Sequence, residues 1–171
     1  DWSEPVQGGL GVCYIKAAMG SLAEYPDLVR SMFINQEESA LGIYNVRFYI
    51  RGKPWVVTVD DRMLFWHDHV MVDQPDPQKL VFAQPSVDGK SIWGAILEKA
   101  WAKVKGNYVH SEAGLMVNGL RALTGLPVYE YMTAQLNERD GSLEEAWARI
   151  KEGEEKGYIM AITTAGDGDD S

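Results

Sequence analysis

The stretch Gln7-Gly8-Gly9-Leu10-Gly11-Val12-Cys13-Tyr14 contains the single cysteine of this 171-residue chain. The residues that follow it, 14–19, can continue as a helix. A cysteine at the first turn of a helix is shifted toward thiolate by unpaired backbone N–H groups and by the helix dipole. The amide of Gln7 and the backbone N–H of Cys13 can supply the two donors that an oxyanion requires. The stretch therefore predicts a cysteine nucleophile, Cys13, with an oxyanion hole that includes Gln7.

Further blocks of the chain decide between this interpretation and a structural cysteine. A lone cysteine is most often a small buried hydrophobic residue. Here the pattern Gly-x-Leu-Gly-x-Cys ends at Cys13, with Leu10 in place of the second cysteine of the papain signature. Related blocks then follow in order at residues 21–26, 42–49, 59–61, 80–83, 92–103 and 123–125. On these motifs the chain resembles the papain-like cysteine proteases and, among them, the calpain family.

The resemblance implies a fold and an activity. The expected fold is α+β: a papain-like, calpain protease-core first subdomain that is helix-rich with a small antiparallel sheet and spans residues 1–171. Calpains carry the catalytic histidine in a Gly-His-Ala-Tyr type motif and the asparagine before Pro-Trp, and neither motif occurs here. The resemblance thus implies the half of an intracellular cysteine endopeptidase that bears the nucleophile. This half would act on protein substrates only with its second subdomain, and would be inactive alone.

The chain has three histidines and one candidate calcium ligand. His67, His69 and His110 match no family position, and we expect them to be exposed loop residues. The resemblance implies calcium, with Glu4 at the place of an acidic ligand. Ser91, however, stands where the family has a glutamate, which weakens the expected calcium site.

Composition limits the class of protein. The chain is 46% hydrophobic with a net charge of −9, which favours one globular domain and argues against a nucleic-acid partner. No apolar run is long enough for a membrane span, and no signal peptide is visible. A single cysteine forms no internal disulfide, so we expect a cytoplasmic location.

Hydrophobic periodicity predicts the elements. We expect helices at 14–24 and 27–33, strands at 44–50 and 55–59, and a long loop at 62–79. A helix capped by Ser91 and ended by Gly106 should follow, then a weaker helix at 113–123. A helix at 142–156 should begin with a capping box formed by Ser142 and Glu145. Residues 158–163 read as a buried strand.

Two functions from different classes remain open. The intact Cys13 and Gln7 favour the protease. Val12, Tyr14 and Lys16 depart from the residues that the family has beside the nucleophile, and Lys16 would place an ammonium on the inward face of the helix unless it reaches the surface. Tyrosine at position 14 is tolerated in papain-like enzymes, but Val12, Lys16 and Ser91 favour the alternative of a catalytically inactive calpain-like scaffold or interaction module.

Overall fold

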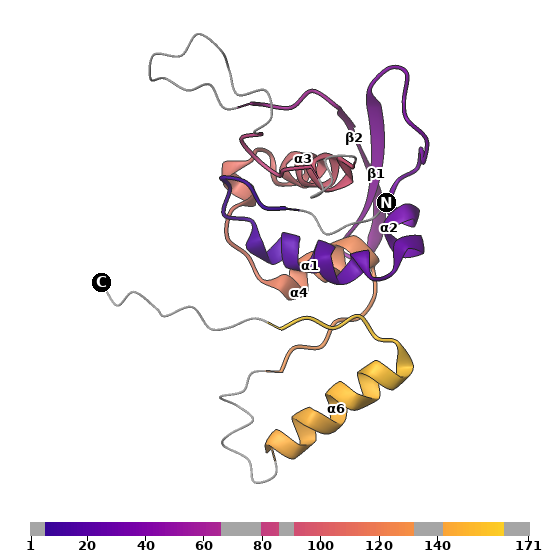
Figure 1. The fold of residues 1–171 in the computed structure, drawn as a ribbon, viewed down its shortest axis with the longest axis vertical. Coiled ribbons are helices and arrows are strands. Elements are labelled where there is room, and N and C mark those ends of the chain that lie inside the picture. Colours follow the sequence, from indigo (N-terminus) through magenta and orange to yellow (C-terminus); the bar gives the residue numbers. More distant parts are fainter. Residues whose placement is uncertain (1–5, 66–79, 86–90, 132–141, 163–171) are drawn as a thin grey trace, which may run out of the picture. The chain divides into compact units, whose positions relative to one another are not determined.

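The computed structural model describes residues 6–65, 80–85, 91–131 and 142–162 (Figure 1). The chain separates into two compact units, Asp1–Val128 and Tyr129–Ser171. Length and composition did not predict this division, and each unit is described by itself. No helix among the described residues is long and apolar enough to cross a membrane.

The fold is α+β, helix-rich with a two-stranded antiparallel sheet, as the sequence predicted. The first unit contains α1 (Cys13–Ala23), α2 (Pro26–Met32), β1 (Ile43–Ile50), β2 (Lys53–Asp60), α3 (Trp93–Lys105), the 3-10 helix η1 (Val109–Ser111) and α4 (Met116–Thr124). The second unit contains α6 (Ser142–Lys156). The predicted loop at 62–79 lies mostly outside the described residues.

The hairpin of β1 and β2 supports the core of the first unit. Its register runs from Ile43 opposite Asp60 to Ile50 opposite Lys53. Arg51 and Gly52 both have positive φ, 52° and 75°, which suits a tight two-residue turn. α3 contacts both strands, while α1 contacts α2 and α4 (Figure 1). α2 and α4 also contact β1, so α1 packs on two helices that themselves contact the hairpin.

Two helix starts differ from the expectation. The N-cap of α3 is Ile92 rather than Ser91, and an isoleucine side chain cannot accept a capping hydrogen bond. α4 begins at Met116 instead of 113, because Ala113 has a left-handed φ of 52° and Leu115 is extended. A helix cannot pass through either conformation. Gly106, with a φ of 102°, ends α3 as predicted.

The second unit corrects one strand prediction. α6 ends at Gly157, where the N–H of Tyr158 donates to Gly153 O (2.8 Å) and the N–H of Gly157 donates to Glu154 O (3.1 Å). This is the Schellman pattern of a glycine helix end. Residues 158–162 form no strand, and Tyr158 and Ile162 are exposed. The prediction of a buried strand is wrong for these residues, because a strand needs a hydrogen-bonding neighbour and none lies among the described residues.

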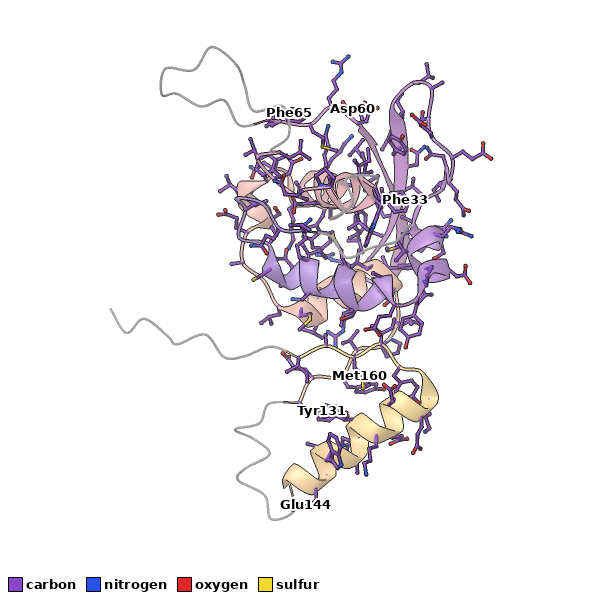
Figure 2. The ribbon with its side chains drawn as sticks, viewed as in Figure 1. Phe33, Asp60, Phe65, Tyr131, Glu144 and Met160 are labelled. Atoms are coloured by element: carbon purple, nitrogen blue, oxygen red, sulfur yellow. The ribbon has the colours of Figure 1, made fainter. Side chains whose placement is uncertain are left out.

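The predicted extent of α6 is confirmed, but its capping box is not described. The side chain of Ser142 lies outside the described part of the chain. Along the helix, Arg149 pairs with Glu145 (2.6 Å), and its guanidinium lies over the ring of Tyr131 (Figure 2). These contacts connect α6 to residues 129–131 within the second unit.

Candidate active site

Cys13 is the first residue of α1, and it is exposed. The carbonyl of Val12 accepts hydrogen bonds from the N–H groups of Ile15 and Lys16, both at 3.1 Å. The first N–H groups of a helix have no intrahelical acceptor, so the amide of Cys13 points out of the helix end. The first turn contains no acidic side chain that would oppose the helix dipole. The predicted nucleophile thus lies at the positive end of a helix and is open to solvent.

Gln7 is exposed on a loop whose backbone is fixed on both sides of it. Val6 O accepts from the N–H of Gln84 (3.0 Å), and the N–H of Gly9 donates to Val81 O (2.9 Å). The residues on either side of Gln7 are therefore paired with one segment, residues 80–84. The structure places Gln7 and Cys13 on the same short loop-to-helix stretch. The orientation of the Gln7 amide toward an oxyanion stays a prediction.

Gly8 is required for a reason that the sequence did not reveal. Positive φ is not the reason, because Gly8, Gly9 and Gly11 all lack it. Instead, a Cβ on Gly8 would overlap the carbonyl oxygen of Phe82. A Cβ on Gly11 would meet no atom within 4 Å. Close backbone approach therefore demands glycine at position 8 and not at position 11.

The segment 80–84 is itself rigidly held. The Gln84 side chain donates to Leu80 O (2.6 Å) and Phe82 O (2.9 Å), and accepts from the N–H of Leu80 (3.1 Å). Leu80 forms a bridge with Phe65, which is labelled in Figure 2. The ring of Phe82 stacks on Tyr108 at 3.7 Å and 11°. Segment 80–84, which pairs with the loop that carries Gln7, thus also has defined contacts with Phe65 and Tyr108.

Tyr14, directly after Cys13, is buried and takes part in two hydrogen bonds. It accepts from Trp101 Nε1 (2.7 Å) and donates to Ser111 O (3.0 Å). Burial raises the pKa of Tyr14, and the hydrogen bond from Trp101 opposes that rise. Its ring leaves no room for a Cβ on Gly114. The tyrosine therefore fills a closed site in which its hydroxyl has partners.

Of the two possibilities that the sequence left open for Lys16, the structure has the buried one. Its side chain is 6% exposed, and its Nζ lies 3.0 Å from Oε2 of Glu98, which is 1% exposed. Lys16 Nζ and Glu98 Oε2 form an ion pair, but neither atom makes a hydrogen bond. Burial lowers the pKa of Lys16, and the charge of Glu98 opposes that change. The partner lies far away in sequence, so the pattern around Cys13 could not reveal it.

The histidines and the calcium residue contribute no described site. His110 is exposed, as expected, and its backbone N–H donates to Asn107 Oδ1 (2.8 Å). His67, His69 and Glu4 lie outside the described residues. Across residues 6–65, 80–85, 91–131 and 142–162, no group of three or more His, Cys, Asp or Glu could hold a metal. Calcium binding at Glu4 therefore stays a prediction.

Comparison with known proteins establishes the family of the chain. Residues 2–170 match the model of the calpain family of cysteine proteases. The chain belongs to the calpain family. It is 33% identical to the calpain-type cysteine protease DEK1 of Zea mays, over 92% of this chain and 7% of that protein.

Two further relatives are calpains of animals. The chain is 30% identical to calpain clp-4 of Caenorhabditis elegans, over 94% of this chain and 21% of that protein. It is 35% identical to the calpain-2 catalytic subunit of Homo sapiens, over 70% of this chain and 16% of that protein. The chain therefore spans a small part of the relatives that it matches.

Proposed function

We propose that this chain is the nucleophile-bearing part of a calpain-type cysteine endopeptidase. Cys13 attacks the carbonyl carbon of a peptide bond, and the oxygen that becomes negative is held by the N–H of Cys13 and the side-chain amide of Gln7. The observation that carries the proposal is the exposed thiol of Cys13 at the first residue of α1. A helix start offers an unpaired N–H that can donate to the oxyanion.

The proposed reaction needs a base, and the Gly-His-Ala-Tyr type motif that holds the histidine of calpains does not occur in this sequence. When the sulfur bonds to the carbonyl carbon, the thiol proton must pass to a base and later to the leaving amine. The resemblance to calpains places that histidine, and the asparagine that orients it, in a second subdomain. We therefore propose that the chain is inactive alone and that the second subdomain and protein substrates are its partners.

The alternative is a calpain-like scaffold or interaction module without protease activity. It was favoured by the unusual residues Val12, Lys16 and Ser91. The contact between Lys16 and Glu98 weakens that argument, because the buried ammonium has a carboxylate partner. The exposure of Cys13 supports the protease. A nucleophile must be accessible to its substrate, whereas a structural cysteine is usually buried.

Variants of the full-length protein test the proposal. Cys13→Ser should abolish peptide cleavage, and Gln7→Ala should lower kcat by about 10²-fold with little change in KM, because the amide acts on the transition state. Gln36→Ala, at another exposed glutamine, is the matched control and should retain the parental rate. Parental rates in both the Gln7 and the Cys13 variants would remove the protease assignment. A folded parent that cleaves no peptide would favour the scaffold.

The chain by itself provides a second test. It should not hydrolyse casein, because general acid–base catalysis worth about 10²–10⁴-fold is missing. Iodoacetamide should nevertheless alkylate Cys13, since the thiol is exposed. Casein hydrolysis that disappears in Cys13→Ala would show that the catalytic set is complete within these residues.

A further inference from the structure

We propose that Glu98 is a positioning residue for the loop that carries Gln7, and that Lys16 is the counterion that keeps its carboxylate in place. The importance of this for catalysis rests on the proposed function of Gln7. The positioning itself is a matter of contacts within the first unit and can be measured without activity.

The first step is the buried ion pair between α1 and α3. Lys16 is one turn after Cys13 on α1, and Glu98 lies in the middle of α3. Their charged atoms are 3.0 Å apart at 6% and 1% exposure. Removing two such charges from water is costly, and apolar residues of similar volume often stabilise a protein as well or better. Stability alone therefore gives no reason for this pair.

The second step is a hydrogen bond that an apolar pair could not make. The other carboxylate oxygen of Glu98, Oε1, accepts from the N–H of Ala83 at 2.8 Å. Ala83 is buried, so its N–H would otherwise be left without water. A hydrogen bond to an ionised acceptor is stronger than a neutral one. Glu98 thus fixes the centre of segment 80–84.

The third step leads from this segment to Gln7. Residues on both sides of Ala83 hold the loop. The backbone N–H of Gln84 donates to Val6 O, and Val81 O accepts from the backbone N–H of Gly9. These two bonds lie on either side of Gln7. A continuous series of contacts therefore runs from the nucleophile helix through Lys16 and Glu98 to segment 80–84, and from there to Gln7. The two ends of the series are the groups that must converge on one oxyanion.

Two double variants separate positioning from simple stabilisation. Lys16→Met with Glu98→Gln removes both charges but keeps an acceptor for Ala83, whereas Lys16→Met with Glu98→Leu removes the acceptor as well. Amide hydrogen exchange of Gly9 and Gln84 is measured by NMR on the whole chain, alongside urea unfolding. We expect exchange of these two amides to accelerate at least tenfold in the leucine variant and less than threefold in the glutamine variant. Amides of the hairpin, such as Val46 and Val57, should keep their exchange rates in both.

The matched control is the ion pair made by the next residue on α3, Lys99, with Asp60 at the end of β2. Lys99 contacts Asp60 at 2.5 Å, and both side chains are partly solvated. Lys99→Met should leave the exchange of Gly9 and Gln84 at the parental rate. If the folded leucine variant protects Gly9 and Gln84 as the parent does, Glu98 does not position the loop and the proposal is wrong.

A measurement on the parental chain covers the case in which a variant does not fold. Native-state exchange in low urea should show Ala83, Gly9 and Gln84 opening together, with one free energy and one urea dependence. Exchange of Gly9 and Gln84 that is a hundredfold faster than that of Ala83 would overturn the proposal. Cys13 and Gln7 are unchanged in every experiment, so failure here is distinct from failure of the protease assignment.

Discussion

The indole Nε1–H of Trp101 donates a 2.7 Å hydrogen bond to the hydroxyl oxygen of Tyr14, the residue next to Cys13. The tyrosine hydroxyl in turn donates to Ser111 O at 3.0 Å. Both aromatic side chains are buried. The start of the nucleophile helix is thus connected to α3 and η1 by polar contacts within an otherwise apolar core.

Removing the hydroxyl should destabilise the first unit. Tyr14→Phe leaves the buried Trp101 N–H and Ser111 O without this partner, and an unsatisfied buried polar group costs about 1–3 kcal/mol. Urea unfolding followed by tryptophan fluorescence measures the change. Tyr25→Phe, at a half-buried tyrosine just after the same helix, is the control and should change stability by less than about 0.5 kcal/mol. Equal stabilities of Tyr14→Phe and the parent would mean that the hydroxyl contributes nothing.

The glycines at 8 and 11 should respond in opposite ways to alanine. Gly8→Ala forces a methyl group into Phe82 O, so the loop and segment 80–84 must separate. Gly11→Ala meets open space and has no positive φ to satisfy. Thermal unfolding should show a clear loss of stability for Gly8→Ala, and no loss or a small gain for Gly11→Ala. Equal melting temperatures for the two variants would contradict the close approach.

Tyr108 should make the fold sensitive to alkaline pH. Burial, with the charges of Glu98 and Asp60, raises the pKa of Tyr108 to about 12, from 10.0 for a free tyrosine. Between these values the unfolded chain loses the proton while the folded chain keeps it, so stability falls as the pH rises. The contribution is complete below about pH 10 and is lost as the pH passes through about 12.

Urea midpoints measured across this pH range provide the test. Tyr108→Phe should decline less steeply than the parent, and the exposed Tyr129→Phe should follow the parent. Parallel curves for the parent and Tyr108→Phe would show that the phenol ionises alike in both states.

The calcium expectation can be tested in a protein that comprises this chain and its second subdomain. Titration calorimetry should show no calcium binding at micromolar concentrations, because Ser91 replaces a carboxylate. Ser91→Glu should restore binding in part, and the uncharged Ser91→Gln should not. Micromolar binding by the parent would show that other oxygen ligands suffice.

Local patterns predicted the elements that position the nucleophile. The helix after Cys13 and the hairpin of β1 and β2 depend on residue periodicity and turn residues that lie close together in sequence. The resemblance to calpains added the family, which the comparison confirmed.

Contacts between distant residues could not be read from such patterns. Burial of the Lys16 ammonium seemed costly from the sequence, because the pattern around Cys13 does not reveal its partner, Glu98, on another helix. The requirement for glycine at position 8 depends on the position of Phe82 O in the folded chain. The apolar run at 158–162 predicted a buried strand, but an apolar run does not supply the neighbour to which a strand must bond.

The exposed apolar residues of the second unit have a consequence for colloidal behaviour. Apolar side chains on α6 and after it are solvent-exposed; they are Trp147, Ile150, Tyr158, Met160 and Ile162. Exposed apolar surface and unpaired extended backbone both promote self-association. The net charge of −9 opposes it through repulsion between molecules. Because added salt screens that repulsion, light scattering from concentrated samples of the chain should rise with ionic strength.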